Sequence, residues 1–240
     1  MSQKFMNKYY IRYLTPAYMY LLQNIKYSIY NRTKVNIISK FLGLDKQIIK
    51  DYYKEISHIK VNVPGMAAAL DSIYVVVRAL KPNTIVETGV ANGASSFCLL
   101  LALKRNKKGH LFSIDFPNLD PTAKLPQNKE VGWLVPKILR DRWTLILGKV
   151  EEKLPKLLEE LGNIDVFYHD SLHTYEHMMF EYKLAWRKLN KGGLLISDNM
   201  DLNNAFKDFC KDVKAPWIDL ANVGFALKEV ACYHEPINKK

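Results

Sequence analysis

The feature that most constrains the fold is a regular alternation of short apolar runs and helical stretches after Pro64. Five such runs follow one another, separated by segments with helical patterning: Thr84–Glu87, His110–Asp115, Trp143–Leu147, Asp165–Tyr168 and Gly193–Ser197. Strands that alternate with helices pair in parallel, because each helix carries the chain back across the sheet before the next strand begins. The pattern therefore predicts a doubly wound α/β fold.

Two later segments are expected to complete the sheet. Ile218–Leu220 and Phe225–Ala231 are candidate strands that follow a helix near Asn203–Lys214. With them the sequence predicts a mostly parallel, seven-stranded, Rossmann-like sheet. A further helix is expected from about Met66 to Leu80, because Lys81-Pro82 prevents its continuation.

The first 60 residues differ from the rest in composition. They hold eleven Lys or Arg against three acidic residues and nine of the fourteen Tyr, in a chain with a formal net charge of +11. Their mixture of apolar, Tyr and basic residues, interrupted at Thr15-Pro16 and near Gly43, predicts amphipathic helices. We expect residues 1–63 to form a basic, Tyr-rich helical leader and residues 64–240 to form the main domain. Such a leader is a cap on the core or across an oligomer interface, a peripheral membrane contact, or a nucleic-acid-binding surface.

Hydropathy and cysteine usage limit the class of protein. No run approaches the roughly 20 apolar residues of a spanning helix, and the N-terminus lacks the apolar core and cleavage site of a signal peptide. Three widely spaced cysteines, Cys98, Cys210 and Cys232, argue against a disulfide framework or a zinc site. We expect a soluble, cytoplasmic protein that forms oligomers, with the leader as its candidate membrane contact.

The first predicted strand ends in the glycine turn ETGVANG, residues 87–93. Gly89 and Gly93 permit a tight turn and a close approach of a ligand to the backbone, and Glu87 places a carboxylate there. The second strand ends at Asp115, 22 residues beyond Gly93. A carboxylate at this position is well placed to accept hydrogen bonds from ribose hydroxyls.

The turn does not match the common phosphate-binding patterns. GxGxxG requires a glycine at Ala91, and GxxxxGK[ST] is also absent. The carboxylate of Glu87 would repel a phosphate. Together with Asp115, the turn therefore favours a nucleoside ligand that lacks phosphates and carries an amino group and a sulfonium, as S-adenosylmethionine (SAM) does. The alternative is that the turn merely joins the strand to the helix.

The fourth and fifth strands end in a second group of polar side chains. Asp170 follows the fourth strand and Asp198-Asn199 follow the fifth, so adjacent strand ends are expected to bring their oxygens together. Two carboxylates and an amide oxygen, completed by water and substrate oxygens, suit octahedral Mg²⁺. The alternative is that Asp198-Asn199 cap the following helix.

His173 lies three residues after Asp170 and is the candidate catalytic base, since a neutral imidazole accepts a proton near pH 7. His169 and His177 are weaker candidates. The segment HDSLH, residues 169–173, also leaves open a His-Asp-His cluster for zinc or iron. Ser171 lacks the G-x-S-x-G elbow of a hydrolase, and residues 176–189 are most simply an amphipathic helix.

Taken together, ETGVANGASS, SIDFP, LILGKVEEKLPKL, DVFYHDSLHTYEH and GGLLISDN resemble class I SAM-dependent methyltransferases. The resemblance covers residues 65–231. The segments are especially similar to the metal-dependent catechol-type O-methyltransferases and to their relatives that act on antibiotic sugars. The resemblance also extends to proteins named as cephalosporin hydroxylases.

The resemblance implies a role for each candidate residue. The methionine part of SAM would be held by residues of the turn and the helix after it: Glu87, Gly89, Gly93 and Ser95. Asp115 would hold the ribose, Phe116 and Val150 would lie near the adenine, and Asp170 would contact the cofactor as well as the metal. Asp170, Asp198 and Asn199 match the Asp, Asp and Asn metal ligands of the catechol-type enzymes. Those enzymes carry a lysine where His173 stands, which leaves the base and the substrate open.

The sequence therefore predicts a Mg²⁺-assisted O-methyltransferase acting on a hydroxylated small molecule. Two other functions remain as alternatives: a nucleic-acid methyltransferase that docks through the basic leader, and a non-catalytic SAM-fold protein that binds a membrane or a partner. The core has no N-P-P-Y type motif for flipped bases, which makes nucleic acid the less favoured substrate.

Overall fold

The computed structural model describes residues 32–57, 70–117 and 125–229. The chain divides into two units, residues 1–50 and 51–240. In the first, residues 32–42 are helical and Gly43 follows with a φ of +63°, where the sequence predicts a break. The helix α3 (Lys46–Ser57) then begins. The predicted break at Thr15-Pro16, most of the predicted leader and the predicted domain boundary after residue 63 lie outside the described residues.

The second unit contains a seven-stranded sheet, as the sequence predicts. Its strands are β1 (Thr84–Thr88), β2 (His110–Asp115), β3 (Trp143–Leu147), β4 (Ile164–His169), β5 (Leu189–Ser197), β6 (Trp217–Leu220) and β7 (Val223–Leu227). They lie in the order β3-β2-β1-β4-β5-β7-β6, and β7 alone runs antiparallel to the other six strands. The fold class is confirmed.

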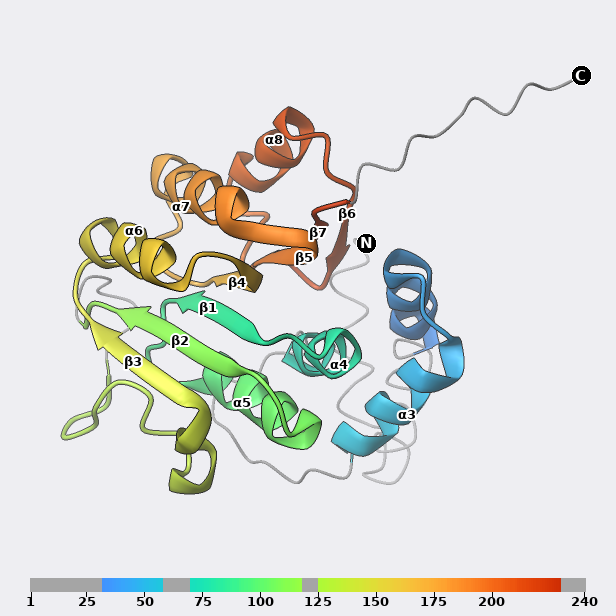
Figure 1. Ribbon diagram of the computed structural model, residues 1–240, viewed down its shortest axis with the longest axis horizontal. Coiled ribbons are helices and arrows are strands. Elements are labelled where there is room, and N and C mark those ends of the chain that lie inside the picture. Colours follow the sequence, from blue (N-terminus) through green and yellow to red (C-terminus); the bar gives the residue numbers. More distant parts are fainter. Residues whose placement is uncertain (1–31, 58–69, 118–124, 230–240) are drawn as a thin grey trace, which may run out of the picture. The chain divides into compact units, whose positions relative to one another are not determined.

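Helices cover both faces of this sheet. They are α4 (Leu70–Leu80), α5 (Ala94–Asn106), α6 (Val150–Leu161), α7 (Tyr175–Lys188) and α8 (Ala205–Asp212), with a 3₁₀ helix at Lys137–Arg142. Figure 1 shows α6, α7 and α8 along one face, and α4 and α5 along the other. On the first face, apolar side chains of the three helices pack on the central strands around Phe167, Met178 and Phe206, all fully buried. This burial stabilises the positions of the strand ends and of the loops that follow them.

The predicted bounds of two strands, β5 and β7, are wrong by more than one residue. β5 begins at Leu189 rather than Gly193, and pairs with Ile164 before a register shift between Ile164 and Val166. The glycine pair within it tolerates this shift, since Gly192 has a φ of +77°. β7 begins and ends earlier than predicted, at Val223 and Leu227.

The parallel register places four strand ends side by side. Thr88 at the end of β1 is level with Ile114 on β2 and with His169 on β4, and His169 is level with Ser197 on β5. Strand order reverses between β1 and β4, which is where open α/β sheets bind ligands. In the described part of the chain, no helix is both long and apolar enough to cross a membrane.

Candidate active site

The glycine turn after β1 is shaped by its neighbours as well as by its own residues. Gly89 has a φ of +81° and donates its N–H to the carbonyl of Ile114, 2.9 Å away. A Cβ at this position would overlap the backbone carbonyl of Asp170. Gly93, with a φ of +90°, precedes α5, and a Cβ there would approach Gly132 to 2.9 Å. Both positions therefore require glycine, and the first brings the ends of β1 and β4 into direct contact.

Asp115 holds the turn from the neighbouring strand end. Its Oδ2 accepts hydrogen bonds from the backbone N–H groups of Val90 (2.7 Å) and Ala91 (2.9 Å). Phe116, the next residue, is exposed, whereas Val150 at the start of α6 is buried in the core. The structure thus places Asp115 and Phe116 beside the turn, with Val150 packed in the interior.

Glu87 is enclosed by hydroxyl groups. Ser95 donates to Oε1 over 2.7 Å, and Ser96 and Ser113 each donate to Oε2 over 2.6 Å. Its side chain is fully buried, and this burial raises the pKa of the carboxyl group to about 7, against the three hydrogen bonds that lower it. Glu87 and Ser95 therefore tie the glycine turn to α5 and β2 from within the protein.

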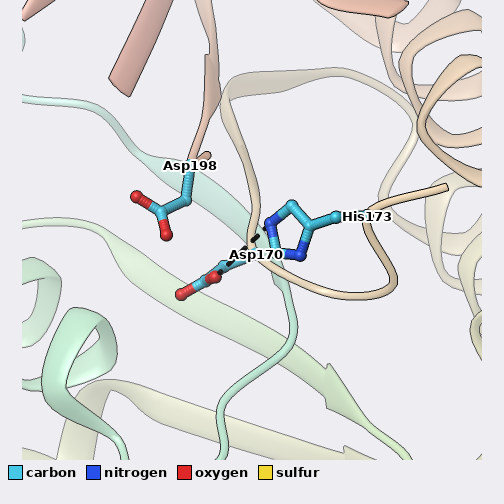
Figure 2. Close-up of side chains that lie close together, drawn as sticks. All are labelled: Asp170, His173 and Asp198. Atoms are coloured by element: carbon cyan, nitrogen blue, oxygen red, sulfur yellow. Dashed lines mark ion pairs between the residues drawn. The ribbon is translucent and has the colours of Figure 1, made fainter. Parts of the chain in front are cut away.

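The ends of β4 and β5 bring three side chains together. Asp170, His173 and Asp198 each offer a ligand atom, and these atoms all lie within 4.8 Å of one another (Figure 2). Nε2 of His173 is 3.9 Å from Oδ1 of Asp170. The sheet fixes their backbones, because Asp170 donates its N–H to Thr88 and Asp198 donates its N–H to His169, at 2.8 and 2.9 Å.

Asn199 follows Asp198 in the turn after β5, with a left-handed φ of +48°. The capping alternative for this pair is wrong, because α8 begins only at Ala205, with Asn204 as its N-cap. The pair therefore has no role at the start of α8.

The electrostatics of the cluster favour a cation. Burial and the neighbouring charge of Asp198 raise the pKa of Asp170 well above its usual value, and burial also raises the pKa of Asp198. Two carboxylates held this close repel each other, and a divalent cation between them would offset that repulsion. Carboxylate oxygens suit Mg²⁺, and an imidazole nitrogen beside them also suits Mn²⁺ or Fe²⁺.

Beneath the cluster lies a carboxylate that the sequence does not single out. Glu181 on α7 is fully buried, and its oxygens accept hydrogen bonds from side chains of β1, β4, the loop after β4, and α7: Thr88, His169, Ser171 and His177. The one available signal is its spacing, four residues after His177 on the buried face of a helix. Ser171 and Nδ1 of His169 both form hydrogen bonds with Glu181. The hydroxyl needed by a hydrolase and a histidine nitrogen of the possible zinc cluster are therefore already bound to this carboxylate.

Comparison with known proteins agrees with this architecture. A family model described as "Methyltransferase domain" matches residues 86–200, from β1 to the turn after β5. That segment contains the glycine turn, Asp115 and the acidic cluster. This match supports the predicted SAM-dependent methyltransferase domain. No curated protein sequence matches the chain.

Solved structures of methyltransferases share the fold of this domain at low sequence identity. The O-methyltransferase TomG of Streptomyces achromogenes, involved in tomaymycin synthesis and solved with SAM, is 15% identical, with a TM-score of 0.53 over 81% of this chain and 95% of that one. A Podospora anserina methyltransferase with bound S-adenosylhomocysteine (SAH) is 14% identical, with a TM-score of 0.51 over 76% and 88%. An O-methyltransferase of Bacillus cereus in complex with SAH is 12% identical, with a TM-score of 0.50 over 80% and 96%.

Proposed function

We propose that this methyltransferase domain transfers the methyl group of SAM to a hydroxyl group of a small molecule, with assistance from a divalent metal. The observation that carries the proposal is the cluster of Asp170, His173 and Asp198 at strand ends adjacent to the glycine turn. A donor site and a metal site side by side are what such a reaction needs, because alignment of donor and acceptor supplies much of the rate enhancement.

In this proposal SAM lies across the ends of β1 and β2. Its ribose hydroxyls bind the carboxylate of Asp115. Both hydrogen bonds from the glycine turn to this carboxylate use Oδ2, which leaves the other oxygen for the ribose. Its adenine lies near the exposed ring of Phe116 and near Val150. The methionine part lies along Gly89 and Gly93, and the buried carboxylate of Glu87, with Ser95, keeps that turn in shape. Asp170 borders both ligands, since its carbonyl meets Gly89.

Asp170, Asp198 and Asn199 would hold the metal, for which Mg²⁺ is the proposed ion. A divalent metal supplies Lewis acidity, which lowers the pKa of a hydroxyl bound to it. His173 would take the proton from that hydroxyl. Its Nε2 lies 3.9 Å from Asp170, so the carboxylate can stabilise the imidazolium that results. A hydroxylated small molecule is the acceptor in this proposal.

Calorimetric titration of the full chain with SAM and SAH tests the donor site. We expect saturable binding of both, and the absence of heat at millimolar ligand would eliminate the proposed donor.

A tritiated methyl transfer assay over hydroxylated aromatic and sugar acceptors tests the reaction. Asp198→Ala and EDTA should abolish transfer while SAH affinity stays within about threefold, because the metal acts on the acceptor. Asp201→Ala, which removes an exposed carboxylate from the same loop, is the matched control and should retain activity. Transfer that survives both EDTA and Asp198→Ala would show that the metal has no part in it.

A further inference from the structure

Glu181 is a junction between the strand ends and the helix that covers them. Its Oε2 accepts from Oγ1 of Thr88 (2.5 Å) and Nδ1 of His169 (2.7 Å). Its Oε1 accepts from Oγ of Ser171 (2.5 Å) and Nε2 of His177 (2.7 Å). His169 and Ser171 are the chain neighbours of Asp170 on either side. One carboxylate thus fixes both flanks of the residue that borders donor and metal.

The protonation state of Glu181 sets the tautomer of His169. Two hydroxyl groups and two imidazole nitrogens lie within hydrogen-bond distance of its oxygens, and hydrogen bonds of this number favour the ionised carboxylate over the protonated one. An ionised carboxylate only accepts hydrogen bonds, so Nδ1 of His169 must carry a proton. In the neutral ring, Nε2 then presents a lone pair.

The ring of His169 is held in one orientation beside the site. It meets Tyr182 edge to face, with centroids 5.4 Å apart, and meets His173 edge to face at 5.1 Å. Its Nε2 is buried and has no hydrogen-bond partner among the residues that the structure describes. A buried polar atom without a partner is costly, so its presence against His173 calls for a role.

We propose that Glu181 is a positioning residue, which fixes His169 as the Nδ1–H tautomer and holds residues 169–173 so that Asp170 and His173 face Asp198. The proposal rests on the proposed function only in taking that cluster as the active site. Glu181 touches neither ligand and acts through His169 and Ser171. Groups that orient a metal ligand from behind commonly change metal affinity tenfold or more when they are removed.

The test is nuclear magnetic resonance of the full chain labelled with ¹⁵N-histidine, in which long-range couplings distinguish the two tautomers. We expect the Nδ1–H form for His169 in the unmodified protein, with the signal assigned by its loss in His169→Gln. In Glu181→Gln, the side-chain amide turns one acceptor into a donor, and His169 should change to the Nε2–H form.

Metal affinity gives a second readout, with Mn²⁺ as the probe and paramagnetic resonance as the measurement. Glu181→Gln should weaken Mn²⁺ binding by about tenfold, while SAH affinity changes less than about twofold. Glu160→Gln, which removes an exposed carboxylate from α6, should change neither the tautomer nor the affinity. Ser171→Ala, a milder variant, should keep the tautomer and weaken Mn²⁺ binding less.

Two outcomes would overturn the proposal. One is an Nε2–H tautomer in the unmodified protein, which decides the matter even if Glu181→Gln does not fold. The other is a Glu181→Gln protein with unchanged tautomer and Mn²⁺ affinity. Failure of the proposed function has a different signature, since a protein that binds no SAH rejects the donor site whatever the His169 tautomer is.

Discussion

At the end of β1, one buried carboxylate lies on each face of the sheet, and their surroundings shift the two pKa values in opposite directions. Successive side chains of a strand point to opposite faces. Glu87 itself points toward α5, where Ser95, Ser96 and Ser113 donate to it, whereas Thr88 binds Glu181 on α7. Both carboxylates are fully buried and fully hydrogen-bonded.

The difference lies in the charge of the partners. Hydroxyl groups satisfy the lone pairs of Glu87 but carry no charge to offset its desolvation, so its pKa rises to about 7. Imidazoles can carry a positive charge, and those of His169 and His177 hold the pKa of Glu181 well below its usual value despite burial. Hydrogen bonds from hydroxyl groups alone therefore leave a buried carboxylate with a pKa near neutral pH, whereas two imidazole partners keep the carboxylate ionised at that pH.

The largest effect is expected from removing Glu181. Glu181→Ala leaves two imidazoles and two hydroxyls buried without their acceptor, and such a loss costs about 3–5 kcal/mol of unfolding free energy at pH 7. Urea denaturation measures it, with Glu160→Ala as the exposed control on α6. A loss no larger than that of the control would mean that water or a rearranged side chain replaces the carboxylate.

Glu87→Gln, in contrast, should raise the free energy of unfolding near neutral pH. A carboxyl group with a raised pKa stabilises the protein fully below its unfolded pKa of 4.5, and this contribution is lost as the pH rises to about 7. Glutamine has no such dependence, so the variant should gain relative to the unmodified protein between these values, by up to about 3 kcal/mol at pH 8. Urea denaturation from pH 4 to 8.5 shows the trend, and a difference independent of pH would contradict the raised pKa.

The contrast between these carboxylates marks the limit of what sequence patterns reveal. The strand and helix pattern predicts the sheet, its seven strands and the segments that end beside the site, since apolar periodicity reports directly on burial. Positions such as Gly89 and Asp170 follow from it, because the loops after parallel strands meet at one edge.

The partner of a buried polar side chain is set by tertiary distance, which has no sequence period. The pattern predicts that Glu87 faces a ligand, and it gives no sign that Ser95, Ser96 and Ser113 donate hydrogen bonds to this carboxylate. For the segment that contains Glu181, the sequence predicts only an amphipathic helix. The hydrogen bond between Glu181 and Thr88 joins residues that are 93 positions apart. Only the folded chain shows that one carboxylate meets hydroxyls and the other meets histidines.

His177 extends the comparison to a smaller effect with its own pH dependence. Burial lowers its pKa, but hydrogen bonds and charges from Glu181 and Glu151 raise it overall. A raised histidine pKa stabilises the protein fully below the unfolded value of 6.5, and this contribution is lost as the pH rises through the folded value. His177→Gln should therefore cost about 1–2 kcal/mol at pH 5.5, the worth of a charge-assisted hydrogen bond, and less at pH 9.

The control for His177 is His110→Gln at the start of β2. Burial and the charge of Arg142 lower the pKa of His110, so its pH dependence has the opposite sign. His110→Gln should gain relative to the unmodified protein as the pH falls. Parallel slopes in the two variants would show that the charge around Glu181 does not set the pKa of His177.

Glu151→Gln should have the smallest effect. Its Oε1 lies 3.2 Å from Nδ1 of His177, but its side chain is 52% exposed, whereas that of His177 is 7% exposed. Solvent screens such a pair, so we expect a loss of no more than about 0.5 kcal/mol at pH 6, reduced further by 0.5 M salt. One nitrogen of His177 binds Glu181 and the other lies beside Glu151. The ratio of the losses in unfolding free energy for Glu151→Gln and His177→Gln therefore shows which of the two carboxylates stabilises the charge on His177. A ratio near one, insensitive to salt, would place that charge at the surface and remove the reason for contrasting Glu181 with Glu87. A small ratio leaves the buried carboxylate as the group that keeps His177 protonated.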